Sequence, residues 1–164
     1  MKRRDMILGA TALTGTGLMA LNWRGQSGSA TAAEGNFEIT LTEAEWRERL
    51  TNDEFYILRE HGTERAWTSD LLDEKRTGNF ICAGCDLPLY SSETKYDSGT
   101  GWPSFYDALP NAIGTSQDTS FGMVRTECHC RRCGGHLGHI FNDGPNPTGL
   151  RYCINSISLD FEED

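Results

Sequence analysis

Four of the six cysteines form two pairs with the same spacing, Cys82 with Cys85 and Cys130 with Cys133. A CxxC pair lets two thiolates bind one ion, and two such pairs are typical of a tetrahedral structural zinc site. We therefore predict that these four cysteines bind one structural Zn2+ per chain and clip together two distant segments. Each CxxC motif alone would also permit a redox-active disulfide, which is the alternative interpretation.

Cys153 stands outside these pairs, in a stretch that we predict to be a strand from residue 150 to residue 159. Because side chains alternate along a strand, Arg151, Cys153 and Asn155 are expected to share one face. The Arg151 cation would favour a thiolate, and the Asn155 amide could hydrogen-bond a polar substrate oxygen. The pattern predicts that Cys153 is a nucleophile, although a lone strand cysteine is also typical of an inert core thiol.

Cys128 is the sixth cysteine and precedes Cys130 by two residues. This spacing is poor for two thiolates that must bind the same ion, so we do not assign Cys128 to the zinc site. It is interpreted as a buried small residue or as an auxiliary thiol.

Two imidazoles and a carboxylate follow the second CxxC pair, at His136, His139 and Asp143. Imidazoles titrate near neutral pH, so these side chains could move protons on a loop that the zinc would immobilise. A second metal site on the His136 and His139 pair is the alternative, and it is weakened by the lack of further ligands at suitable spacing.

Trp102 follows a Gly-rich stretch and precedes Pro103, which favours an extended backbone at the tryptophan. Its ring could form the wall of a small apolar pocket. The alternative is that Trp102, as one of four tryptophans, fills the core.

The first 32 residues have the features of a twin-arginine export signal. Arg3 and Arg4 precede a weakly apolar stretch from residue 6 to residue 21, and residues 30–32 form a small-x-small cleavage site. A membrane anchor is the alternative, but this 16-residue stretch is shorter than the ~20 apolar residues that a spanning helix needs. We expect cleavage, no stable membrane insertion afterwards, and a periplasmic or otherwise extracytoplasmic location in a bacterium.

The expected mature chain is strongly acidic. Residues 1–32 carry four basic residues and one acidic residue, so their removal lowers the formal net charge from −9 to −12. A negative surface repels phosphates, and no nucleic-acid partner is therefore expected. Residues 33–40 form a polar lead, and residues 41–164 suit a single domain, which we expect to be a monomer.

The sequence after the polar lead predicts two short helices and then strands. Thr42 with Glu45 and Thr51 with Glu54 have the form of capping boxes, each followed by apolar residues at helical spacing. From Asn79 onward, short apolar runs are bounded by Gly, Pro, Asn and Ser, which is typical of antiparallel strands. The fold is therefore predicted to be mainly β, of the α+β class, with short N-terminal helices.

Segments 82–85, 87–90, 97–105, 136–139 and 149–156 read CAGC, LPLY, DSGTGWPSF, HLGH and GLRYCINS. Together and in this order they resemble the B-type peptide-methionine (R)-S-oxide reductases, from about Leu41 to the C-terminus. The resemblance implies two antiparallel β-sheets in a tent-like arrangement, with a structural zinc opposite the active site. It also implies a role in protein repair under oxidative stress.

The resemblance implies a role for each candidate residue. Cys153 resembles the nucleophile, whose thiolate attacks the sulfoxide sulfur and becomes a sulfenic acid while methionine leaves. Arg151 would support the thiolate, and Trp102 matches the aromatic residue that contacts the S-methyl group. Only the R epimer should fit between such apolar and polar walls. The residues that match positions for binding the sulfoxide oxygen or water and for delivering protons are His139, His136, Asp143 and Asn155.

One residue departs from the family pattern, because Thr100 stands where many members carry a resolving cysteine. A threonine cannot form the disulfide that returns the nucleophile to its thiol. Either Cys128 takes over this role, which would need movement beside the zinc site, or an external thiol reduces the sulfenic acid. We favour the external thiol, a thioredoxin-like or other extracytoplasmic reductant.

Two other functional classes would use some of the same residues. A zinc-ribbon-like binding module would keep the four paired cysteines and would not need Cys153. A thiol-disulfide oxidoreductase would need a redox-active CxxC pair in place of a metal-bound one.

Overall fold

The computed structural model describes residues 35–164, so the predicted export signal and its cleavage site lie outside the described residues. Two short helices come first, α1 (Glu43–Arg49) and α2 (Asn52–Glu60). Both predicted capping boxes are present, with Thr42 and Thr51 as the N-caps. None of the helices in residues 35–164 combines the length and the apolar character needed to cross a membrane.

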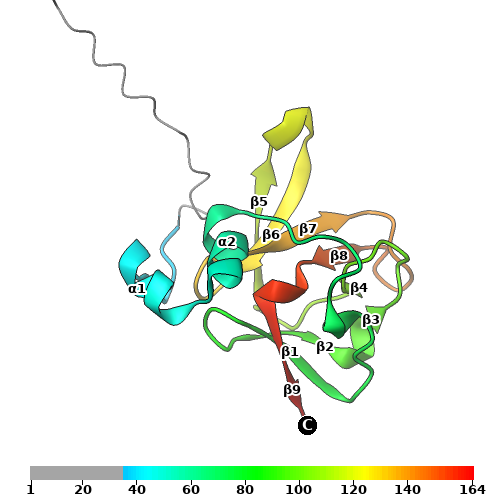
Figure 1. Cartoon of the computed structure of the whole chain (residues 1–164). Coiled ribbons are helices and arrows are strands. Elements are labelled where there is room, and N and C mark those ends of the chain that lie inside the picture. The colour runs from blue at the N-terminus through cyan, green and yellow to red at the C-terminus, as the bar shows by residue number, and fades with distance from the viewer. Residues whose placement is uncertain (1–34) are drawn as a thin grey trace, which may run out of the picture.

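Within residues 35–164, nine strands form two antiparallel sheets, as the family resemblance implied (Figure 1). The smaller sheet has the order β2 (Pro88–Ser91), β1 (Gly78–Cys82) and β9 (Leu159–Glu163). The larger sheet has the order β3 (Lys95–Tyr96), β4 (Ser104–Phe105), β8 (Arg151–Ile154), β7 (His136–Phe141), β6 (Arg125–Cys130) and β5 (Ile113–Asp118). Three 3-10 turns connect consecutive strands in the described residues, namely η2 (Ser92–Thr94), η3 (Ser120–Gly122) and η4 (Ser156–Ser158), and a fourth, η1 (Asp70–Leu72), lies between α2 and β1.

The prediction of a single strand over residues 150–159 was wrong. β8 ends at Ile154, the turn η4 follows, and β9 begins at Leu159 in the other sheet. The cause is a contact that is distant in sequence, because the Glu64 carboxylate accepts hydrogen bonds from the Ser156 backbone N–H at 2.7 Å and from the Ile157 N–H at 3.2 Å. These backbone groups are therefore not available for a strand ladder, and the chain turns.

Aromatic side chains fill the core that the strands enclose. The rings of Tyr90 and Phe105 are stacked with centroids 4.4 Å apart, and Phe80 meets Phe105 edge-on at 4.9 Å. All three side chains are completely buried. Since β1, β2 and β4 carry these residues, the two sheets share one hydrophobic core.

The strand register places Cys153 at the centre of the larger sheet. Cys153 lies opposite Ser104 of β4 on one side and opposite His139 of β7 on the other. The hairpin formed by β5 and β6 projects from the body of the molecule near β7 (Figure 1). The fold therefore brings together strands that are far apart in sequence around the predicted nucleophile.

Candidate active site and metal site

The four paired cysteines converge as the sequence predicted. Their sulfur atoms all lie within 4.8 Å of one another, and all four residues are buried free thiols. The Sγ atoms of Cys82 and Cys133 are 3.8 Å apart, and those of Cys85 and Cys130 are 3.5 Å apart. A tetrahedral site with Zn–S bonds of ~2.3 Å needs sulfur separations of about 3.8 Å. The donor set therefore fits Zn2+.

Backbone turns position these thiols. Cys82 ends β1 of the smaller sheet and Cys130 ends β6 of the larger one, so a bound ion would join the two sheets. The turn after each strand closes with a backbone hydrogen bond, from Cys85 N to the Cys82 carbonyl at 3.1 Å and from Gly134 N to the Cys130 carbonyl at 2.8 Å. Gly134 has a φ of 69°, a left-handed conformation that glycine adopts without a steric cost.

A pocket of about 210 Å3 lies beside Cys153. Four of the predicted site residues line it together, and the structure adds four more that the sequence did not indicate. The predicted ones are Cys153, Trp102, His139 and Asn155, and the added ones are Thr63, Arg125, Gly138 and Phe141. The pocket thus combines a thiol, an imidazole, an amide and an aromatic wall.

The Cys153 thiol is subject to two opposing influences. Burial raises its pKa above that of an ordinary thiol, whereas the positive charge of Arg151 and a contact from Thr100 lower it. The Thr100 hydroxyl lies 4.0 Å from the sulfur and is itself bonded to the Ser98 hydroxyl at 2.8 Å. Thr100 therefore occupies the position next to the nucleophile, with a hydroxyl in place of a second thiol.

Arg151 is held by Asp143 and does not move freely toward the pocket. Its Nε and Nη2 atoms each donate a hydrogen bond of 2.9 Å to the Asp143 carboxylate, and its guanidinium carbon lies 4.3 Å from the centre of the Phe141 ring. The Asp143 side chain is 63% exposed. The structure therefore places Asp143 behind Arg151, and it does not line the pocket as a proton carrier.

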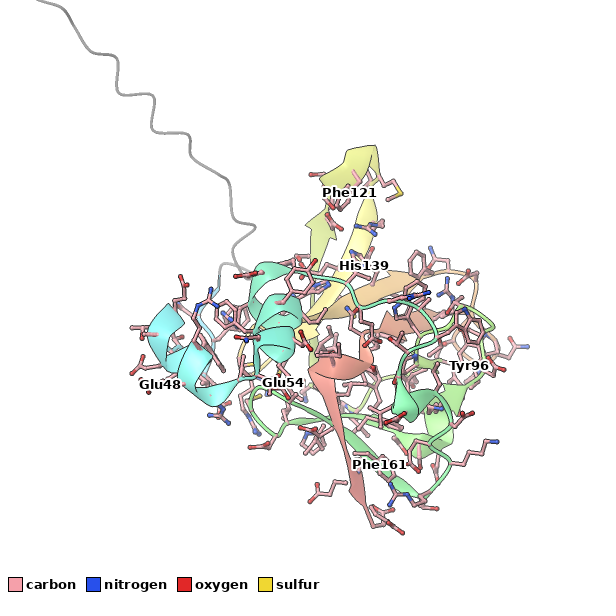
Figure 2. The ribbon with its side chains drawn as sticks, viewed as in Figure 1. Glu48, Glu54, Tyr96, Phe121, His139 and Phe161 are labelled. Carbon is pink, nitrogen blue, oxygen red and sulfur yellow. The ribbon has the colours of Figure 1, made fainter. Side chains whose placement is uncertain are left out.

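His139 is oriented by a carboxylate from the projecting hairpin. Its Nε2 atom lies 2.7 Å from an Asp118 oxygen, and Arg125 donates to the same oxygen at 2.5 Å. Burial lowers the pKa of His139, and the Asp118 hydrogen bond opposes that shift. Figure 2 shows His139 close to this hairpin, whose tip carries Phe121. His139 is therefore a positioned imidazole that lines the pocket.

His136 does not line the pocket. Its Nδ1 atom lies 2.7 Å from a Glu127 oxygen that is also 3.1 Å from Nδ1 of His61, and its ring lies edge-on to His139 with centroids 5.5 Å apart. His136 is almost fully buried. The alternative of a metal site on His136 and His139 gains no support, because His136 belongs to a cluster with His61 and Glu127 behind the site and His139 does not. His136 thus packs behind His139 and does not reach the pocket.

Asn155 is fixed at both ends of its amide. Its Nδ2 donates to the Leu137 carbonyl at 3.0 Å, and its Oδ1 accepts from the Glu64 N–H at 3.1 Å. The side chain is buried, with 4% of the residue exposed. Asn155 follows β8 as the residue before η4, so its placement comes from these contacts and not from strand alternation.

Glu64 is a site residue that the sequence reasoning missed. Its carbonyl accepts a 3.3 Å hydrogen bond from the Trp102 indole, and its N–H binds Asn155. Its carboxylate holds Ser156 through the backbone N–H and through the hydroxyl at 2.6 Å. Glu64 therefore connects both walls of the pocket. A sequence motif would have had to span some 90 residues, from Glu64 to Ser156, to indicate that Glu64 belongs to the site.

A resolving role for Cys128 is incompatible with the intact sheet. Cys128 lies on β6 opposite Gly138, whereas Cys153 lies on β8, so β7 separates them. Two strand spacings of about 4.8 Å place their backbones further apart than the ~4.4–6.8 Å that a disulfide spans. Cys128 is also fully buried, and burial raises the pKa of its thiol. Of the two interpretations that the sequence allowed for Cys128, the structure agrees with a buried small residue.

Comparison with known proteins gives a consistent family match. Residues 50–163 match the SelR domain. The chain is 51% identical over 130 residues to a protein of Leptospira interrogans named peptide methionine sulfoxide reductase MsrB, which covers 79% of this chain and 99% of that protein. Proteins with the same name are 58% identical over 121 residues in Thiobacillus denitrificans (73% and 92% covered) and 50% identical over 135 residues in Leifsonia xyli (81% and 97% covered).

Replacing one paired cysteine tests the metal site. Cys85→Ser should lose the bound zinc and lower the midpoint of thermal unfolding, because a closed site of four thiolates contributes directly to folding free energy. Zinc content by mass spectrometry and calorimetry of the same samples measure both effects. Cys128→Ala is the matched control and should keep one zinc per chain. Full zinc loading in Cys85→Ser would contradict the assignment.

The pH dependence of alkylation tests the electrostatics of Cys153. The thiolate is the reactive form, so iodoacetamide labelling should increase as pH rises toward the raised pKa. In Arg151→Met the favourable charge is lost, and the labelling curve should move to higher pH, with severalfold slower labelling at pH 8. Arg49→Met on α1 is the control and should leave the curve in place. An unmoved curve in Arg151→Met would exclude an electrostatic role for Arg151.

Proposed function

The chain belongs to the SelR-domain family of methionine sulfoxide reductases, and on this basis we propose that it reduces methionine sulfoxide in oxidised proteins back to methionine. The observation that carries the proposal is the pocket that brings Cys153 together with Trp102, His139 and Asn155. A nucleophilic thiol, a proton carrier and an apolar wall are the parts that this reaction needs.

The reaction balances as a two-electron transfer from the thiol to the substrate. The Cys153 thiolate attacks the sulfoxide sulfur and forms an S–S bond, while the S–O bond breaks and the oxygen takes up two protons and leaves as water. Water then attacks the Cys153 sulfur and the S–S bond breaks, so that methionine leaves, Cys153 becomes a sulfenic acid and one proton is released. His139 lines the same pocket and is held by Asp118, so it is the group that transfers a proton to the sulfoxide oxygen. Arg151 stabilises the thiolate before attack.

Selectivity for the R epimer follows from the two unlike walls of the pocket. Trp102 offers an aromatic face to the S-methyl group, and His139 with Asn155 offers polar atoms to the oxygen. Glu64 fixes Trp102 and Asn155 relative to each other. An S sulfoxide would have to exchange its methyl group and its oxygen between these walls, which leaves polar groups unpaired.

The sulfenic acid is reduced by an external thiol. Two equivalents of thiol restore Cys153 and release water and a disulfide. The support for this route is the hydroxyl of Thr100 beside Cys153 and the separation of Cys128 by an intervening strand. The donor is a thioredoxin-like or other extracytoplasmic dithiol.

The four paired cysteines would hold Zn2+ as a structural ion. A set of four thiolates leaves no open coordination position, so the ion stabilises the fold and takes no part in the chemistry. The support is the convergence of the four buried thiols between the two sheets.

We propose in addition that the protein is exported through the twin-arginine pathway and acts outside the cytoplasm. The support is the sequence of residues 1–32 with Arg3 and Arg4 before the apolar stretch. Fractionation of cells that carry Arg3→Lys with Arg4→Lys should show the protein retained in the cytoplasm. Unchanged export of this variant would refute the proposal.

An epimer-resolved assay tests the function. The wild type with dithiothreitol should reduce R but not S methionine sulfoxide. Cys153→Ser should lose about 10³-fold or more in kcat/KM, as expected for removal of a nucleophile. Cys128→Ala should retain turnover, and peptide mass spectrometry after substrate oxidation without reductant should find Cys153 as a sulfenic acid. Retained R activity in Cys153→Ser would sink the mechanism, and a Cys128–Cys153 crosslink would sink external reduction.

A further inference from the structure

A larger groove of about 640 Å3 borders the pocket that contains Cys153. Trp102 lines both hollows, so they are neighbours on the surface. The groove has apolar side chains along it, contributed by Trp67, Leu72, Tyr96, Trp102 and Pro103. None of the residues proposed to react lies in this groove, and nothing in the proposed chemistry accounts for it.

The size of the pocket requires space outside it for a protein substrate. Pockets that enclose a whole small ligand usually measure ~300–1,000 Å3, whereas the pocket beside Cys153 measures about 210 Å3. That volume suits a single side chain. The polypeptide on either side of a methionine sulfoxide must therefore lie on the neighbouring surface, and the adjoining groove offers room for several residues.

Trp67 is the most unusual residue of the groove. It is 66% exposed although it is a large apolar side chain. The backbone N–H of Trp67 donates a hydrogen bond to the Gly101 carbonyl at 2.8 Å, and the backbone φ of Trp67 is 65°. A Cβ atom added to Gly101 would lie only 2.7 Å from the Trp67 ring. The ring therefore lies directly against Gly101, the residue before Trp102. Exposed tryptophans are enriched in binding hot spots.

Tyr96 lines the groove and lies near Arg151 and Cys153. Its hydroxyl has no hydrogen-bond partner among the described residues, and it is close enough to Arg151 and Cys153 for their charges to act on its pKa. A buried hydroxyl without a partner costs free energy unless it forms a hydrogen bond. A peptide group in the groove would supply that partner. Figure 2 shows Tyr96 on the opposite side of the molecule from Glu48 on α1.

The charges around the groove favour one kind of peptide. Four carboxylates and two amines line it: Asp73, Glu74, Glu93 and Asp97 against Lys75 and Lys95. Glu74 is already paired with Arg76, whose Nε lies 2.9 Å from its carboxylate, which leaves three carboxylates against the two amines. Lys95 is further engaged, since its Nζ donates to the Leu72 carbonyl at 2.7 Å. Excess negative charge attracts cationic residues and repels acidic ones.

We propose that this groove binds the polypeptide segment beside the methionine sulfoxide and selects apolar or basic residues there. The inference rests on the proposed function and names which oxidised segments the site takes. The side chain of the oxidised residue enters the pocket past Trp102, and its neighbours pack on Trp67. Segments with acidic neighbours are repelled by the carboxylates.

Binding to an inactive form and turnover together test the groove. The probes are a hexapeptide with one methionine R-sulfoxide between Leu and Lys, its counterpart with Glu in place of Lys, and N-acetylmethionine R-sulfoxide. In Trp67→Ala the ratio of kcat/KM for the Lys peptide to that for the acetylated amino acid should fall at least about fivefold, and Trp67→Phe should restore most of it. In the Cys153→Ser background, calorimetry should show the matching loss of peptide affinity.

A paired charge change tests the selectivity. The wild type should prefer the Lys peptide to the Glu peptide by roughly threefold or more at low salt. Glu93→Gln should reduce this preference, whereas Glu48→Gln, with the same change in net charge on α1, should retain it. If the ratio of kcat/KM for the Lys peptide to that for the acetylated amino acid were unchanged in Trp67→Ala, the groove proposal would be wrong. It would also be wrong if this ratio fell only in Phe121→Ala, on the hairpin tip. Failure of the wild type to reduce any of the probes would instead contradict the proposed function.

Discussion

The Glu64 carboxylate fixes the point at which the chain passes from one sheet to the other. It accepts hydrogen bonds from Ser156 and Ile157, 92 and 93 residues later in the sequence, and thereby ends β8 at Ile154, directly before Asn155. The backbone of the same residue binds Asn155 and the Trp102 indole. One buried residue therefore sets both the course of the backbone and the separation of the pocket walls. Hydrogen bonds to a charged acceptor are stronger than those between neutral groups, which suits this role.

With a bound ion, the paired cysteines would provide a second connection between the sheets, at the ends of β1 and β6. A chain with about 130 residues after the expected cleavage has only a moderate core, so a metal clip that closes a long loop adds useful stability. Glu64 and the cysteine cluster act on different strands. A bound ion would thus tie the larger sheet to the smaller one at a second place, and the central strands that carry Cys153 and His139 pair in register between the two places.

The reactive end of the site combines burial with compensating charge. Burial raises the pKa of Cys153, and Arg151 opposes this effect. Arg151 is in turn paired with Asp143, just as His139 is paired with Asp118. Two of the proposed functional groups, Arg151 and His139, are therefore each oriented by a carboxylate. The polar atoms proposed to react are thus distinct from the carboxylates that only position them. The acidic groove beyond Trp102 contains none of these groups.

The sequence by itself determined the features that depend on a few neighbouring residues. Both capping boxes, the mainly β class and the convergence of the four paired cysteines were correctly predicted, because helix caps and CxxC pairs need only short spacings. The tertiary structure alone decided the break after Ile154, the role of Glu64, the position of His136 behind His139 and the separation of Cys128 from Cys153. These depend on strand order and on hydrogen bonds between residues far apart in the chain. Alternation along one strand carries no information about which distant backbone groups will compete for its hydrogen bonds.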